Sequence, residues 1–101
     1  MFVVEEQGEV AGFANLLVDE GWAEIDLLYV DPDFSGRGVA RQAIEAVEAE
    51  AGRHGLDRLW VDASLLATPV FEHLGYMITE RYVKERGAVT FLNTWLVKDL
   101  D

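Results

Sequence analysis

The chain has 101 residues, of which 50% are hydrophobic, and it carries a formal net charge of −11 with no cysteine. A chain of this length forms one domain that buries about 60–70% of its unfolded surface, so residues 1–101 are expected to be a single domain. The lack of cysteine excludes disulfides, thiolate metal sites and a cysteine nucleophile, and the negative charge argues against nucleic acid and anionic membranes as partners. No apolar run approaches a membrane span and no signal peptide is recognisable, so a cytoplasmic protein is expected.

The acidic residues are concentrated early in the chain. Residues 1–36 contain no Lys or Arg, although Asp and Glu are frequent there. Such a surface serves solubility, and it also attracts a cationic amine. Acidity alone does not choose between these two interpretations.

Strand and helix patterns alternate along the sequence. The predicted elements are strands at 2–6, 10–18 and 22–30, a helix at 39–51, a strand at 59–63, a short helix at 69–74, and strands at 77–84 and 89–97. Period-two alternation of apolar residues supports the strands, and an apolar stripe at helical spacing supports the long helix. The alternation slips at Leu27-Leu28, which predicts a bulge that bends this strand away from a neighbour.

The order β-β-β-α-β-α-β-β defines the expected fold class. A helix between two strands implies one parallel crossover, whereas the short turns elsewhere join antiparallel neighbours. The chain is therefore expected to be α/β (α+β), with a mixed, mainly antiparallel sheet.

The stretch from Leu28 to Ala40 carries the clearest functional signal, because it runs from a strand through a glycine-bearing turn into a helix. Unpaired N–H groups at a helix start bind anions, and glycines let phosphates approach the backbone. Arg37 and Arg41 are the first cations in the chain, so this turn is the expected anion site.

This stretch resembles the acetyl-CoA signature of the GNAT superfamily of N-acetyltransferases, Arg/Gln-x-x-Gly-x-Gly/Ala. The matching residues are Ser35, Gly36, Arg37, Gly38, Val39 and Ala40. Ser35 departs from the signature, which removes one polar or cationic side chain near the phosphates. The resemblance continues in order over residues 22–76 and ends in Phe71-Glu72-His73-Leu74-Gly75-Tyr76.

The resemblance implies acetyl-CoA as co-substrate and assigns residues to its parts. It places the pantetheine arm against the bulged strand at Leu28, Tyr29 and Val30, and the pyrophosphate against the backbone of residues 36–41, with Arg37 and Arg41 as optional partners. Ser64 takes the position of an asparagine that orients the arm in many relatives. Phe71 is expected to pack against the coenzyme.

Proton transfer has one candidate base. Glu24 falls where some relatives place a glutamate general base, and it shares its strand face with Asp26. The alternative is that both are exposed carboxylates without a catalytic role. Phe71 stands where many relatives carry the tyrosine that protonates the leaving thiolate, so the general acid is not identified. No metal site is apparent.

The resemblance also implies that a first strand and first helices of the fold do not precede the first hairpin here. An exposed sheet edge would result, which predicts a homodimer. The leading hypothesis is transfer of acetyl from acetyl-CoA to an amine by direct attack. The alternatives are a non-catalytic acyl-CoA-binding or regulatory module, and a structural interaction domain with a vestigial site.

Overall fold

The computed structural model describes residues 1–100, which form one mixed sheet with two α-helices. The elements are β1 (Phe2–Glu6), β2 (Glu9–Asp19), β3 (Trp22–Val30), a 3-10 turn (Pro32–Phe34), α1 (Val39–Arg53), β4 (Arg58–Ser64), α2 (Thr68–His73), β5 (Met77–Arg86) and β6 (Val89–Asp99). Every predicted strand and helix is present, with ends that differ by at most two residues. The 3-10 turn was not predicted.

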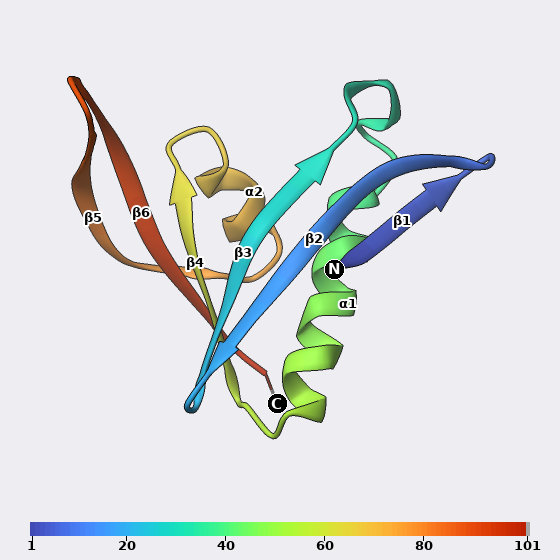
Figure 1. Ribbon diagram of the computed structural model, residues 1–101, viewed down its shortest axis with the longest axis horizontal. Coiled ribbons are helices and arrows are strands. Elements are labelled where there is room, and N and C mark those ends of the chain that lie inside the picture. Colours follow the sequence, from blue (N-terminus) through green and yellow to red (C-terminus); the bar gives the residue numbers. More distant parts are fainter. Residues whose placement is uncertain (101) are drawn as a thin grey trace.

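The sheet confirms the predicted fold class. Its six strands lie in the order β1-β2-β3-β4-β6-β5 (Figure 1). All neighbours are antiparallel except β3 and β4, which are joined by the crossover through α1. β6 is inserted between β4 and β5, although it follows both in the chain. The dimer expected from an exposed edge at β1 stays a prediction.

A bulge interrupts β3, one position earlier than the break at Leu27-Leu28 predicts. The residues on either side of Asp26 pair with the adjacent Asn15 and Leu16 of β2, so Asp26 is the extra residue. Leu27 therefore faces solvent with 46% of its surface exposed, whereas simple alternation placed it on the buried face. Leu28 packs against the core instead.

The parallel neighbours β3 and β4 part soon after they meet. Their register contains only the pairs Glu24 with Trp60 and Ile25 with Val61. Beyond the bulge at Asp26 the two strands diverge, and Figure 1 shows them opening upward like a V. A cleft between their carboxyl-terminal halves follows from this short pairing.

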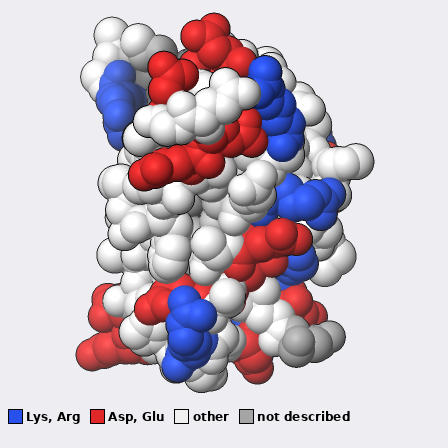
Figure 2. Space-filling view, turned by 90° about the vertical axis from the view of Figure 1, so that its right-hand side faces the viewer, with Lys and Arg blue, Asp and Glu red and all other residues white. Residues whose placement is uncertain are grey.

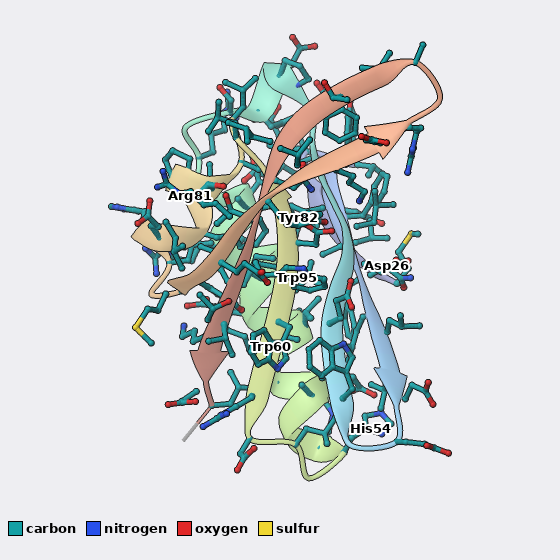
Figure 3. The ribbon with its side chains drawn as sticks, turned by 90° about the vertical axis from the view of Figure 1, so that its left-hand side faces the viewer. Asp26, His54, Trp60, Arg81, Tyr82 and Trp95 are labelled. Atoms are coloured by element: carbon teal, nitrogen blue, oxygen red, sulfur yellow. The ribbon has the colours of Figure 1, made fainter. Side chains whose placement is uncertain are left out.

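One face of the sheet carries the hydrophobic core and both helices. The apolar stripe of α1 packs on this face through the buried side chains Val39, Ala43, Ile44, Val47 and Ala51. Figure 3 views the opposite face, with α1 behind the sheet and with Trp60, Trp95 and Tyr82 toward the viewer. No helix among residues 1–100 covers this open face.

The charged residues on the side with β1 and α1 are mixed. Figure 2 shows basic side chains interspersed with acidic ones, without a single patch of either sign. None of the helices in residues 1–100 combines the length and the apolar character needed to cross a membrane.

β2, β3 and the start of α1 approach one another closely at Gly12. A Cβ atom there would lie 2.6 Å from the carbonyl oxygen of Tyr29 and 2.7 Å from Cγ1 of Val39. The backbone oxygen belongs to a paired strand and cannot move freely, so the start of α1 is seated directly on a glycine.

We expect Gly12→Ala to lower the free energy of unfolding by about 1–3 kcal/mol, the usual effect of overpacking. Gly52→Ala in α1 is the matched control, because a Cβ there meets nothing within 4 Å. The control should raise stability by up to about 1 kcal/mol through helix propensity. Urea denaturation measures both, and equal stability of the Gly12→Ala protein and the parent would contradict the close approach.

Candidate functional site

The turn before α1 has the backbone geometry of an anion site. Gly36 and Gly38 have φ values of 78° and 75°, in the left-handed region that favours glycine. Gly38 is the N-cap of α1, where no side chain makes a capping hydrogen bond, and the first turn has no acidic residue. The amides at the helix start therefore remain available to a negatively charged group.

A hollow of about 500 Å³ lies in front of this turn. Its lining comes from the turn, from the start of α1 and from α2: Gly36, Gly38, Ala40, Arg41, Pro69, Val70, His73 and Leu74. The two predicted arginines behave differently here. Arg41 lines the hollow, whereas the Arg37 guanidinium lies 3.6 Å from Glu6 and over the ring of Phe34.

The cleft between β3 and β4 is a second, smaller hollow of about 190 Å³. It is lined by Ile25, Asp26, Leu27, Leu28, Val61, Asp62, Ala63, Ser64, Ala67 and Phe71. Three residues predicted to contact the coenzyme arm, Leu28, Ser64 and Phe71, are brought together here. Tyr29 and Val30 continue β3 beyond the lining, with the ring of Tyr29 stacked on Phe13.

The polar groups at the end of β4 close one side of the cleft. The Oγ of Ser64 accepts a hydrogen bond from the amide of Ala67, and its own proton is free to be donated. Phe71 is buried, with 3% of its surface exposed, and its ring meets that of Tyr76 edge to face. Its packing within the chain is therefore hydrophobic, and its expected contact with the coenzyme stays a prediction.

Glu24 lies at the base of the cleft rather than in its lining. It belongs to the last paired segment of β3 and β4, and it accepts a hydrogen bond of 3.0 Å from Nε1 of Trp22. Asp26, at the bulge, does line the cleft and accepts a 3.3 Å hydrogen bond from Asn15. Within residues 1–100, no cluster of three or more metal-binding side chains is present.

A hydrogen-bonded network around Asp62 extends from the cleft across the open face. Asp62 accepts hydrogen bonds from Tyr82 at 2.5 Å, from Lys84 at 3.3 Å and from the side-chain amide of Asn93 at 2.9 Å. Sequence reasoning did not identify these residues. Asp62 is one polar residue in an alternating strand, and its partners come from β5 and β6, whose pairing the sequence does not give.

The network sets the protonation of its members. Burial by itself would raise the pKa of Asp62, but the hydrogen bonds from Tyr82, Asn93 and Lys84 together hold that pKa below its usual value. The hydrogen bond to Asp62, followed by burial and the charges of Asp62, Glu24 and Glu80, raises the pKa of Tyr82 to about 12. The cleft is therefore lined by the carboxylate of Asp62, which is held by the phenol of Tyr82, a group that stays protonated.

With this geometry described, the comparison with known proteins identifies the class. Residues 1–76 match the model of the acetyltransferase (GNAT) family. The chain belongs to this family. It is 38% identical over 66 residues to YafP of Escherichia coli K12, an uncharacterised N-acetyltransferase, and that match covers 63% of the chain and 40% of YafP.

Solved structures agree with this assignment. A GCN5-related N-acetyltransferase from Rhodopseudomonas palustris matches 97% of the chain at 36% identity with a TM-score of 0.86, and the chain spans 59% of that protein. An aminoglycoside 6'-N-acetyltransferase solved with coenzyme A matches 98% of the chain at 16% identity with a TM-score of 0.84, over 71% of its own length. The ribosomal-protein-S18-alanine N-acetyltransferase of Escherichia coli matches 96% of the chain at 20% identity with a TM-score of 0.79, over 66% of its own length. At these two lower identities the likeness concerns the fold.

The Asp62–Tyr82 hydrogen bond has a measurable consequence at high pH. A pKa of about 12 for Tyr82 lies above the ordinary 10.0, so the bond stabilises the fold below pH 10 and this contribution is lost as the pH rises through 12. At pH 11 we expect about a tenth of Tyr82 to be ionised. In Asp62→Asn the pKa should return toward its ordinary value, and most of Tyr82 should be ionised.

Near-ultraviolet absorbance of phenolate measures the ionised fraction, and subtraction of the Tyr82→Phe spectrum isolates Tyr82. Far-ultraviolet circular dichroism checks that the fold is intact at each pH. Equal ionisation of Tyr82 at pH 11 with and without the Asp62 carboxylate would show that the bond does not form.

Proposed function

We propose that this protein is an N-acetyltransferase that transfers the acetyl group of acetyl-CoA to an amine. The observation that supports this most strongly is that two hollows adjoin the same short helix. Phe71 of α2 lines the cleft between β3 and β4, and the neighbouring Val70 lines the hollow at the glycine turn of α1. A long thioester with a phosphate end needs two such neighbouring sites.

The described residues fit both ends of acetyl-CoA. The pyrophosphate would meet the amides of residues 38–41 and the side chain of Arg41, where the open space beside Gly36 and Gly38 allows close approach. The arm would extend β-strand hydrogen bonding along Leu28, whose strand has no partner on this side beyond Ile25. Arg37, which pairs with Glu6, is the weaker candidate for a phosphate contact.

The reaction needs a neutral amine, an activated thioester and a proton for the leaving sulfur. The amine nitrogen attacks the thioester carbon, the new C–N bond forms, the C–S bond breaks, and the sulfur leaves as a thiolate that takes up a proton. Alignment of the two reactants in the cleft supplies much of the acceleration, with no covalent enzyme intermediate. We propose Glu24, acting through a water molecule, as the group that removes the proton from the amine.

Gly38→Val should weaken acetyl-CoA binding at least about tenfold, because a branched side chain would occupy the space in front of the helix amides. The substitution also strains the left-handed backbone, so a control must carry the same strain elsewhere. Gly21→Val is matched: Gly21 has a φ of 83° in the β2–β3 turn, with nothing within 4 Å of a Cβ.

Isothermal titration calorimetry with acetyl-CoA measures both variants. We expect weakened binding for Gly38→Val and unchanged binding for Gly21→Val. Unchanged affinity of a folded Gly38→Val protein would remove the assignment of the phosphate site.

Glu24→Gln should lower turnover by about 10²–10⁴-fold while keeping acetyl-CoA affinity, the usual share of a general base. Glu20→Gln is the control, since it makes the same change on an exposed residue of the same hairpin. Thiol release from acetyl-CoA in the presence of an amine panel measures the rate over a range of pH. Full turnover of Glu24→Gln at every pH would show that Glu24 is a surface residue without a catalytic role.

A further inference from the structure

The open face of the sheet contains a third hollow, which we call the tryptophan hollow. It is lined by Trp22, Trp60, Thr79, Glu80 and Trp95 and has a volume of about 500 Å³. The lining includes all three tryptophans of the chain, which come from three different strands. Figure 3 shows Trp60 and Trp95 side by side on the face away from α1.

Two of the three indole rings are stacked, and the third is perpendicular to them. Trp22 stacks on Trp60 with a centroid distance of 4.9 Å, and Trp95 stands edge-on to both, at 6.2 and 6.5 Å. Trp22 is 39% exposed, so part of the aromatic surface faces the hollow and solvent. The face of an indole ring carries partial negative charge and attracts a cation.

Carboxylates surround these rings. Glu80 lines the hollow itself. Asp62 lies directly opposite Trp95 in the register of β4 and β6. The nearby cation, Lys84, is paired with Asp62. The hollow thus combines aromatic faces with a carboxylate that has no ion-pair partner among the described residues. A cation is the ligand that interacts favourably with both.

Asn93 provides an unsatisfied acceptor next to Asp62, a residue of the cleft lining. Asn93, two residues before Trp95 on β6, donates its amide to Asp62, while its buried Oδ1 has no hydrogen-bond partner among the described residues. A buried carbonyl oxygen without a donor is costly, so a donor from water or from a ligand would stabilise this atom. An amine N–H supplies one.

We propose that the tryptophan hollow binds a small organic cation, and that the acceptor carries two amines, one held in the hollow and one presented for acetylation near Asn93. The second half of this proposal rests on the proposed acetyl transfer. The cation site itself does not, because it is defined by the rings and by Glu80.

The chemistry of attack explains why two nitrogens are needed. The attacking amine must lose its charge, whereas a nitrogen held by indole faces and carboxylates is stabilised in its charged form. One nitrogen cannot satisfy both conditions. Asn93 and Trp95 are two residues apart on the same face of β6, which is about 7 Å along a strand. This separation suits a short aliphatic diamine.

Intrinsic fluorescence tests the cation site directly, because every tryptophan of the chain lies in it. Choline is the probe, since it cannot be acetylated on nitrogen, and 3,3-dimethylbutanol is its uncharged counterpart of the same shape. We expect a saturable spectral change with choline and none with the alcohol, in the absence of acetyl-CoA. Trp60→Leu should weaken choline binding at least about tenfold, and Glu80→Gln about threefold or more. Glu85→Gln, an equal charge change at another exposed position of β5, should leave it unchanged.

Turnover tests the choice of acceptor. Thiol release should show a kcat/KM for 1,4-diaminobutane at least about tenfold above that for butylamine, and Glu80→Gln should reduce this preference whereas Glu85→Gln should not. If no amine that is tested gives thiol release, the proposed function is overturned, even if choline binds. Normal release from butylamine without a preference for the diamine would overturn only the two-amine proposal.

Two further results would overturn the cation site. One is equal binding of choline and 3,3-dimethylbutanol, which would make the hollow a simple apolar surface. The other combines two measurements: light scattering gives about twice the 11.3 kDa chain mass, and choline leaves the fluorescence of this dimer unchanged. In that case a second copy of the chain covers the tryptophans.

Discussion

The parting of β3 and β4 is the constraint on which the rest of the structure depends. Parallel strands normally hydrogen-bond along their whole length, but here the ladder stops after Ile25 and Val61. The extra residue Asp26 turns the following part of β3 out of register, so its polar groups face a gap instead of a strand. This gap leaves backbone donors and acceptors available to an extended ligand.

The chain that follows this parting leads to the proposed anion site. β3 leads through the 3-10 turn into Gly36 and Gly38, and α1 then packs on the core side of the sheet. Gly12 allows β2, β3 and the start of α1 to meet without a side chain between them. Backbone packing therefore sets the position of the helix amides that we propose as the anion site, and Arg41 is the cationic side chain that lines the hollow beside them.

The sequence predicts the parts of this structure that depend on local patterns. Alternation in Trp22–Val30 and the apolar stripe from Val39 gave the correct elements, and the spacing of Gly36 and Gly38 gave the correct turn. The predicted position of the bulge was wrong by one residue. Asp26 fits the apolar–polar alternation of the sequence, but in the structure it is the extra residue that has no partner in β2. The network of Asp62 was missed, since its partners lie 20 to 31 residues away and depend on strand order.

The cluster of tryptophans also could not be predicted from local sequence patterns. Each lies in a strand where a core or interface role is the ordinary expectation, and nothing local indicates that the three rings meet. Their meeting results from β6 lying beside β4 and β3 pairing with β4 at Trp60.

The position of β6 has a consequence for how the chain acquires its fold during synthesis. β4 and β5 are both translated before β6, yet they become connected only through it. Until β6 leaves the ribosome, the nascent chain has an open edge along β4, and the indoles of Trp22 and Trp60 lack their contact with Trp95. Folding of this half is therefore delayed past the translation of β5, a period in which chaperones that bind exposed strand edges have access to it.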